Sequence, residues 1–287
     1  MVGGLQVEPI SLLTTLDQNY LPQLQILLTS LSFNNPNDTF SIFLLHGGIS
    51  EDALVPIQRQ CDKYGYSFLS VRVDDDLFEG APVTQQYPKE MYYRLLAPYL
   101  LPKPAKRILY LDPDILVINP LRPLWETKLE GNLFAAAAHT GKTELANNVN
   151  QLRLGTNRAY YNSGVLLMDL EAGRQQIDSQ ALFRYVEQHR RELILPDQDI
   201  MNALYSEQIL PIDDGIWNYD ARNYSNYLLR SGGIYDTQWV MAHTSILHFC
   251  GKQKPWKKNN MYRFGVLYQH YMQLTRRSLG SDSLLSI

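Results

Sequence analysis

The sequence predicts an α/β fold in which a mostly parallel β-sheet carries helices on both faces. Short apolar runs of strand length alternate with longer segments whose apolar residues recur at helical spacing. Of the 287 residues 45% are hydrophobic, and nineteen Tyr, nine Phe and four Trp supply large side chains for a core. This composition excludes a disordered or collagen-like chain. Ligands of such sheets bind at the carboxyl ends of the strands, so we look for functional residues there.

The first half of the chain alternates most clearly. Residues 10–15 predict a buried strand and residues 17–20 a loop, after which leucines recur with the spacing of one helix face. The next expected elements are a strand at 40–46, an amphipathic helix at 51–64, a strand at 66–73, a helix at 90–100 and a strand at 107–112. This order is typical of β-α-β units, which build parallel sheets.

The second half continues with less regular spacing. Its expected strands are 133–138, 164–170 and 246–249, and its expected helices are 179–191 and 197–205. The sequence contains no internal repeat and no low-complexity linker. We therefore expect one main domain over residues 9–256, preceded by a leader at 1–8 and followed by a tail at 257–287.

The end of the chain differs from the rest in charge. Between Lys252 and Arg277 lie seven Lys and Arg and no Asp or Glu, whereas the whole chain has a net charge of −3. The remainder therefore carries a net charge of about −10. Several aromatic residues alternate with these cations: Trp256, Tyr262, Phe264, Tyr268 and Tyr271. An acidic body of this kind argues against a protein that mainly coats nucleic acid.

Cysteine content and the first residues indicate the compartment. Cys61 and Cys250 are too few for a disulfide framework or a thiolate zinc site. Residues 1–8 lack the basic start and apolar core of a signal peptide, and no run approaches about 18 apolar residues. We expect a cytoplasmic protein that does not cross a membrane.

Two carboxylates end the strand predicted at 107–112. Asp112 and Asp114 are separated by one residue, so both project to the same side of an extended chain. Two hard oxygen ligands at a strand's carboxyl end suit a divalent cation that bridges a diphosphate, and the alternative is a solvated turn. His248, after a late strand, offers a nitrogen ligand that favours Mn²⁺, and the alternative is a hydrogen-bonded structural histidine.

Further polar clusters adjoin other predicted elements. Gly251 permits close approach of the backbone to a phosphate, and Lys254 supplies a cation at similar reach. Residues 197–199, Asp-Gln-Asp, open a predicted helix, where an ordinary helix cap is the alternative. Residues 161–168 predict a turn into a core strand.

These clusters occur in an order that resembles the retaining glycosyltransferases of family 8, which include bacterial lipooligosaccharide galactosyltransferases, bacterial glucosyltransferases and glycogenin. The matching segments are 14–20, 92–95, 112–114 (a D-x-D motif), 162–164, 197–199 and 248–256. They span residues 10–256, nearly the whole body. The sequence departs from the commonest family pattern at Pro113 and at Ser163, where alanine is frequent, and neither change removes a ligand.

The resemblance implies a GT-A fold that binds a UDP-sugar and a metal, Mn²⁺ with Mg²⁺ as the alternative. The implied uridine pocket consists of Thr15, Asp17, Asn19 and Tyr20, with Tyr20 stacked on the base. The implied metal ligands are Asp112, Asp114 and His248, and the implied phosphate contacts are Gly251 and Lys254. The implied sugar contacts are Arg94, Asn162 and Asp197, with Gln198 beside the anomeric carbon, and Gly164 belongs to the implied UDP-sugar site.

The resemblance further implies transfer of glucose or galactose to a hydroxyl of a glycan, glycoprotein or glycolipid in bacterial cell-envelope synthesis. A UDP leaving group gains negative charge, which a dication and Lys254 stabilise. Gln198 is a weak nucleophile, so a front-face mechanism fits better than double displacement, with Asp199 as the alternative nucleophile.

The competing hypotheses are an inactive sugar-nucleotide or glycan-binding protein and a metal-dependent phosphohydrolase. The full metal and phosphate set disfavours the first, and the lack of a second carboxylate cluster disfavours the second.

Two interpretations of the tail remain open. Its cations and aromatic rings have the composition of a segment that lies peripherally on the anionic inner face of a cell membrane. Alternatively, Tyr262, Phe264, Leu267 and Tyr271 pack a closing helix onto the domain.

Overall fold

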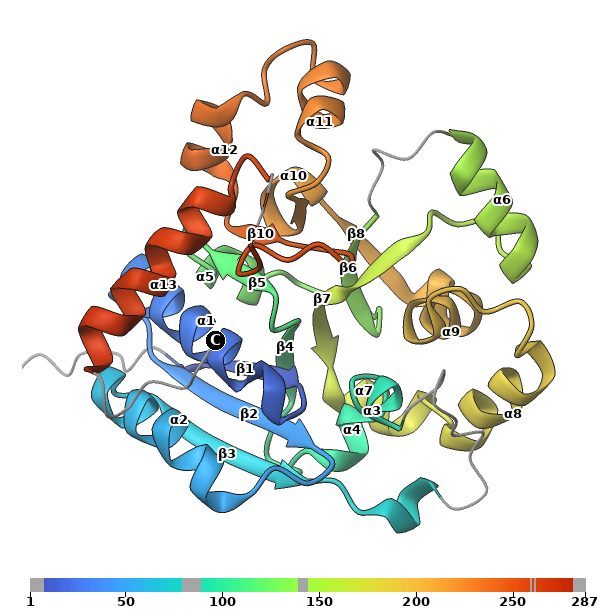
Figure 1. Ribbon diagram of the computed structural model, residues 1–287. Coiled ribbons are helices and arrows are strands. Elements are labelled where there is room, and N and C mark those ends of the chain that lie inside the picture. The colour runs from blue at the N-terminus through green and yellow to red at the C-terminus, as the bar shows by residue number, and fades with distance from the viewer. Residues whose placement is uncertain (1–7, 79–88, 139–143, 259, 261, 281–287) are drawn as a thin grey trace, which may run out of the picture.

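A seven-stranded sheet in the order β3-β2-β1-β4-β7-β6-β8 forms the centre of the protein (Figure 1). The computed structural model describes residues 8–78, 89–138, 144–258, 260 and 262–280. The strands are β1 Ile10–Thr15, β2 Phe40–His46, β3 Ser67–Arg72, β4 Arg107–Leu111, β6 Phe134–Ala138, β7 Tyr161–Asp169 and β8 Ile209–Ile212. Only β7 runs antiparallel to its sheet neighbours in the part of the chain that is described. The predicted α/β fold with a mostly parallel sheet is confirmed.

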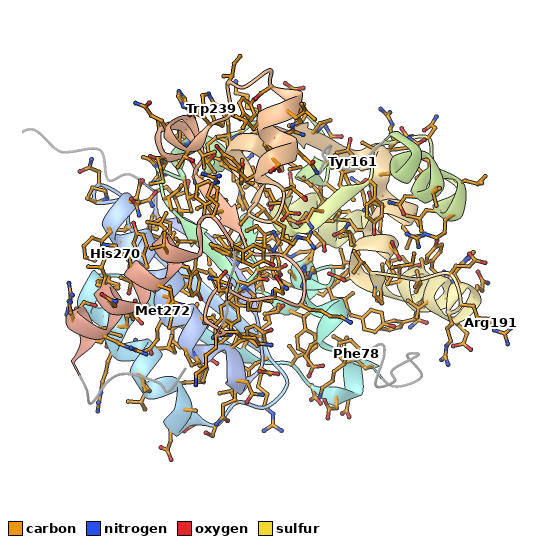
Figure 2. All side chains as sticks on the ribbon, turned by 45° about the horizontal axis from the view of Figure 1, so that its top comes forward. Phe78, Tyr161, Arg191, Trp239, His270 and Met272 are labelled. Carbon is orange, nitrogen blue, oxygen red and sulfur yellow. The ribbon has the colours of Figure 1, made fainter. Side chains whose placement is uncertain are left out.

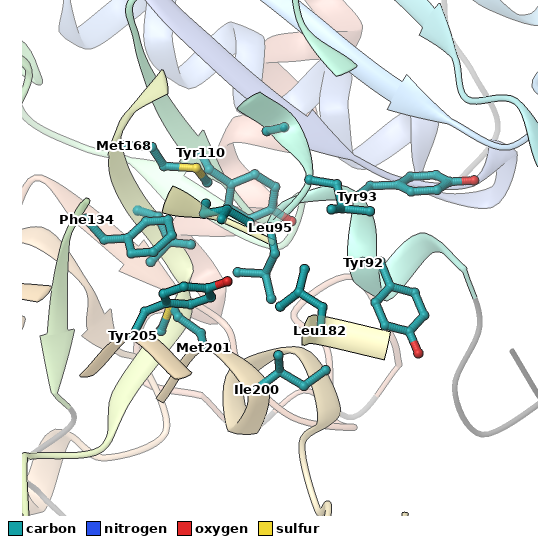
Figure 3. Packing of buried hydrophobic residues seen from close by; sticks show 14 of the residues in the cluster. Tyr92, Tyr93, Leu95, Tyr110, Phe134, Met168, Leu182, Ile200, Met201 and Tyr205 are labelled. Atoms are coloured by element: carbon teal, nitrogen blue, oxygen red, sulfur yellow. The ribbon is translucent and has the colours of Figure 1, made fainter. Parts of the chain in front are cut away.

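Helices cover both faces of this sheet. One face carries α1 Leu21–Asn34, α2 Glu51–Tyr64 and α5 Arg122–Trp125. The other carries α3 Glu90–Tyr93, α4 Ala97–Leu100, α7 Leu170–Gln176, α8 Ser179–His189 and α9 Pro196–Tyr205. Side chains alternate along β4, so that Ile108 and Tyr110 enter the second core while Leu109 and Leu111 enter the first. Figure 3 shows Tyr110 in the second core with Leu95, Leu182 and Met201.

Local sequence accounts for the element boundaries. Glu51 and Asp52 lie in the first turn of α2, where they complement the helix dipole, and Gly65 ends the helix at a φ of 70°. The helix predicted at 90–100 is wrong as a continuous element, because Pro98 cannot donate the backbone hydrogen bond that continuity requires. The strand predicted at 164–170 begins earlier, at Tyr161, so residues 162–164 belong to β7 and not to a turn.

A small second sheet closes one end of the main sheet. It contains β5 Ile115–Val117, β10 Ile246–His248 and β9 Tyr219–Asp220, in that order. The last helix, α13 Gly265–Leu279, packs on α1 and shares a hydrophobic core with this sheet. In Figure 2, Met272 and His270 mark α13; Met272 is buried in this core and His270 is exposed.

The structure corrects the view of residues 257–287 as an appendage. Phe264, Tyr268 and Tyr271 are buried, so these rings stabilise the domain and are not available for a membrane interface. The interpretation as a closing helix is therefore confirmed for the described residues. The cations Lys257, Lys258, Arg263, Arg276 and Arg277 are exposed. Residues 281–287, and residues 1–7 of the expected leader, lie outside the described residues.

Several elements were not expected from the sequence. They are α5, α6 Glu144–Leu154, α7, α10 Asp214–Trp217, α11 Tyr224–Arg230, α12 Thr237–His243 and the 3₁₀ turns Gln18–Tyr20, Asp75–Phe78 and Ser206–Gln208, together with β5, β8 and β9. Most are too short to show a hydrophobic period. Among the described residues, no helix has the length and apolar character needed to span a bilayer.

Candidate active site

Three side chains meet where the two sheets join. Asp112 follows β4, Asp114 precedes β5, and His248 ends β10. Because His248 pairs with Ile115 in the antiparallel β5–β10 ladder, its ring lies beside Asp114. His248 Nε2 is 3.2 Å from Asp114 Oδ1 and 3.7 Å from Asp112 Oδ2. One ligand atom of each residue lies within 4.8 Å of the other two, so the three can share one ion.

The donor set fits a divalent cation. Two carboxylates with one imidazole suit Mn²⁺, and Mg²⁺ is compatible with the oxygen ligands. His248 Nδ1 donates to Asn218 Oδ1 over 2.9 Å, because an amide oxygen can only accept. This bond fixes the ring and directs Nε2 toward Asp112 and Asp114, where it would be the ligand atom of a bound cation.

Basic side chains compensate the carboxylates. Lys254 Nζ donates to Asp114, and Arg94 Nη2 lies 3.1 Å from Asp112 Oδ1. Burial opposes the ionisation of Asp114, but His248 and Lys254 outweigh it and hold the pKa of that carboxyl well below its usual range. Asp114 is therefore ionised, as a metal ligand must be, throughout the physiological pH range.

A cavity of about 460 Å³ opens beside these ligands. Arg94 and Asp197 form part of its wall, with Arg94 Nη1 3.1 Å from Asp197 Oδ2. Ser163 Oγ also donates to Asp197 Oδ2, over 2.9 Å. The side chains at this wall offer donors and acceptors in fixed directions, as the recognition of sugar hydroxyls requires. The sequence-predicted residues that line the cavity are Arg94, Asp112, Asp114, Asn162, Asp197, Gln198, His248 and Gly251.

A chain of hydrogen bonds joins His248, a candidate metal ligand, to Gln198 in the cavity wall. Beyond His248, Asn218 Nδ2 donates to Asn162 Oδ1 over 2.9 Å, and Asn162 Nδ2 donates to Gln198 Oε1 over 3.0 Å. Gln198 is buried, so its amide has a defined orientation next to the cavity. The orientation of Gln198 therefore depends on the same residues that orient His248.

A neighbouring cleft of about 490 Å³ contains the residues predicted for the nucleotide. Thr15, Asp17 and Tyr20 line it together with Asp112 and Asp114. Tyr20 contacts Trp256 edge to face, with ring centroids 6.1 Å apart. Asn19 lines neither cavity, and its backbone N–H donates to Asp17 Oδ1 over 2.8 Å, so that the Asp17 side chain caps the 3₁₀ turn Gln18–Tyr20.

Two predicted glycines allow close packing. A Cβ on Gly164 would lie 2.4 Å from His248 Cε1 and 2.5 Å from Asp112 Oδ2. Gly164 thus makes room for the side chains of His248 and Asp112 and does not line the cavity. Gly251 has a φ of 84°, which favours glycine, and begins the loop that carries Lys254. Tyr262 Oη holds this loop by donating to Gln253 O over 2.9 Å.

The structure does not support Asp199 as a nucleophile. Its side chain is fully buried, does not line the cavity, and pairs with Arg153. Tyr160 Oη and two backbone N–H groups of residues 194–195 also donate to it. Burial opposes ionisation, but these donors lower the pKa of Asp199. Asp199 therefore fixes the start of α9, and this geometry disfavours the nucleophilic role, which stays a prediction.

Sequence reasoning missed three residues of this region: Asn218, Arg222 and Tyr160. Arg222 and Tyr160 line the cavity, and Asn218 orients His248. Asn218 and Arg222 lie in an irregular stretch with short elements, where neither period nor motif draws attention to them. Tyr160 lies two residues before the matched segment 162–164, and this proximity in sequence was the available signal.

The chain matches known proteins over nearly its whole length. A family model described as glycosyl transferase family 8 matches residues 11–260. General stress protein A of Bacillus subtilis strain 168 is 28% identical over 286 residues, covering 96% of this chain and 98% of that protein. Lipopolysaccharide 1,2-glucosyltransferase of Escherichia coli strain K12 is 24% identical, covering 86% of this chain and 72% of that protein.

Solved structures agree with the fold. A crystal structure of the galactosyltransferase LgtC in complex with donor and acceptor sugar analogues superimposes with a TM-score of 0.77 at 22% identity, covering 94% of this chain and all of that chain. This likeness confirms the predicted GT-A architecture. The family match over residues 11–260 shows that the chain belongs to glycosyltransferase family 8 and is a sugar-transferring enzyme.

Proposed function

We propose that the enzyme is a retaining hexosyltransferase that depends on a divalent cation and moves glucose or galactose from a UDP-sugar to a hydroxyl of a glycan, glycoprotein or glycolipid. The convergence of Asp112, Asp114 and His248 beside a polar cavity carries this proposal. When bound there, Mn²⁺ or Mg²⁺ supplies Lewis-acid stabilisation of the diphosphate leaving group. The UDP moiety is assigned to the cleft of Thr15 and Tyr20.

The protein's own residues hold the reactants. Asp197 and Asn162 bind sugar hydroxyls, and Lys254, next to Asp114, lies where the phosphate charge develops. The bond from C1 to the UDP oxygen breaks while the acceptor oxygen bonds C1 on the same face. The acceptor proton passes to the departing phosphate oxygen. Gln198 presents a neutral amide to this region, and Asp199 is withdrawn from it, which supports a front-face reaction without a covalent intermediate.

The names of the relatives support the acceptor class. Curated relatives include a lipopolysaccharide 1,2-glucosyltransferase and a lipopolysaccharide 1,3-galactosyltransferase, of Escherichia coli and Salmonella typhimurium. We therefore propose a cell-envelope glycan as acceptor and the cytoplasmic side of the membrane as the place of action. Contact with the membrane would rest on exposed cations such as Lys257 and Lys258, because the nearby aromatic rings are buried.

A donor screen tests the proposal. Purified enzyme is incubated with UDP-glucose, UDP-galactose, UDP-N-acetylglucosamine or UDP-galacturonate, and free UDP is measured with Mn²⁺ or excess chelator. We expect turnover of a hexose donor that chelator abolishes and that Asp112→Asn reduces by at least about 100-fold. The control Glu207→Gln alters only an exposed ion pair and should match the wild type. Undiminished turnover in chelator contradicts the proposal, and UDP binding without turnover identifies an inactive binding protein.

A further inference from the structure

One cation of the cavity wall has no role in the site described so far. Arg222 lines the same cavity as Asp112, Asp114 and His248, and it follows β9. In the parallel β9–β10 pairing, Asp220 lies opposite His248, so Arg222 emerges on the metal side of the small sheet. Its position is therefore set by the same strands that position the predicted metal ligand.

The guanidinium is held so that one end faces the cavity. Arg222 Nε donates to Asp220 Oδ1 over 2.9 Å, and Nη2 donates to Asp220 Oδ2 over 2.6 Å. Asp220 is 1% exposed and does not line the cavity. Arg94 differs, because its partners Asp112 and Asp197 both lie in the cavity wall. Arg222 thus directs positive charge into the cavity with its counter-charge behind it.

The Nη1 atom points at the phosphate-side loop. A Cβ added to Gly251 would lie 2.8 Å from Nη1, and only glycine leaves that space open. No described residue accepts a hydrogen bond from Nη1, so its N–H groups are available to a ligand between Arg222 and Gly251. Arg222 binds Asp220 through Nε and Nη2 and presents Nη1 to the cavity. A guanidinium held in this way is well suited to bind an oxyanion.

We propose that Arg222 is an oxyanion-binding residue that contacts the β-phosphate of the UDP-sugar and of the UDP product. The inference rests on the proposed function, which places a diphosphate at Gly251 and Lys254. Arg222 then supplies a second cation, opposite Lys254, to the group whose negative charge grows as the sugar leaves. The alternative source of an oxyanion at this position is a phosphate or carboxylate on the acceptor.

Calorimetric titration with UDP and with UMP, each with Mn²⁺, separates these sources. We expect Arg222→Gln to weaken UDP binding by about 10- to 100-fold, the range of a hydrogen bond to a charged group, and to leave UMP binding unchanged. Arg222→Lys should recover part of the loss, because it restores the charge without the fork. The matched control is Arg230→Gln, since Arg230 also pairs with a buried aspartate, Asp214, but does not line the cavity. Its UDP affinity should match that of the wild type.

The outcomes are distinct. Unchanged UDP affinity in Arg222→Gln, or equal losses of affinity for UDP and UMP, overturns the β-phosphate assignment. If UDP affinity is unchanged and the KM for the acceptor is raised, the residue is assigned to the acceptor site. Melting temperatures of both glutamine variants show whether a loss of affinity only reflects unfolding. If the wild type does not bind UDP but binds inorganic pyrophosphate with Mn²⁺ in an Arg222-dependent way, the proposed function fails and the oxyanion site stands.

Discussion

Asp199→Asn is the perturbation that best separates a structural from a catalytic role in this site. The carboxylate is fully buried and accepts hydrogen bonds from both terminal nitrogens of Arg153, at 2.8 and 2.7 Å. It also accepts from Tyr160 Oη at 2.5 Å and from the N–H groups of Ile194 and Leu195 at 2.6 and 3.0 Å. An asparagine removes the negative charge and turns one acceptor into a donor, which leaves Arg153 without a counter-charge.

The expected magnitude follows from the full burial of Asp199 and the partial burial of Arg153, whose side chain is 14% exposed. Breaking a buried ion pair from one side costs about 3–5 kcal/mol. For a chain of this size that corresponds to a fall in Tm of about 6–20 °C, measured by differential scanning calorimetry. The matched control is Glu207→Gln, because the pair of Glu207 with Arg158 is exposed. Its Tm should match that of the wild type, because solvent screens an exposed pair.

The loss of stability in Asp199→Asn should become smaller as the pH falls. The pKa of Asp199 is lower in the folded protein than its ordinary value, so its stabilising contribution is present above about pH 4. That contribution is lost as the pH falls through the lower folded pKa. The difference in stability between wild type and Asp199→Asn should therefore narrow below about pH 4.

Activity completes the test. We expect the double variant Arg153→Met/Asp199→Leu to regain part of the lost stability, because it removes both charges, and to retain measurable transfer. An Asp199→Asn variant with wild-type Tm and no transfer would refute the structural role, and so would a glycosyl adduct trapped on Asp199.

Three further perturbations test separate parts of the site and fold. Asn218→Ala should weaken Mn²⁺ binding by about 10- to 100-fold and lower kcat, because it removes the hydrogen bond to His248 and the hydrogen bond to Asn162 that leads to Gln198. Titration calorimetry with Mn²⁺ measures the affinity, and an unchanged affinity would contradict the prediction. Gly164→Ala should lower Mn²⁺ affinity, because its Cβ would meet His248 and Asp112, two of the side chains that are predicted to bind the metal. A variant with a lower Tm but wild-type Mn²⁺ affinity would contradict this prediction. Truncation after Trp256 should prevent folding, because it removes Tyr268 and the rest of α13 from a core; circular dichroism of a stable, cooperatively melting truncated protein would show that the tail is an appendage after all.

The elements that the sequence could predict were those with a regular period. The bounds of β1, β2 and α2 agree with the residue ranges predicted from apolar spacing, because each buries one well-defined face. The split between α3 and α4 depends on Pro98, a local effect that a hydrophobic pattern does not reveal. The antiparallel course of β7 depends on which strands become neighbours, which the composition of a single strand does not specify.

The candidate site also contains residues that the sequence could predict and residues that it could not. Residues 112–114 and His248 could be found because chemistry demands particular side chains at strand ends, and the structure brings them together. The structural role of Asp199 could not, because it arises from Arg153 on α6, a helix that the sequence did not predict. Arg222 and Asn218 acquire meaning only through the pairing of β9 with β10.

The most direct test of the proposed function is the anomer that the enzyme releases first from its donor. Proton NMR follows slow hydrolysis of UDP-glucose and UDP-galactose with Mn²⁺ in the absence of acceptor, before the free sugar mutarotates. Retention at C1 predicts that the α-anomer appears first and that Asp112→Asn suppresses its release. Initial release of the β-anomer, or release that persists undiminished in excess chelator, would contradict a retaining, metal-dependent transferase.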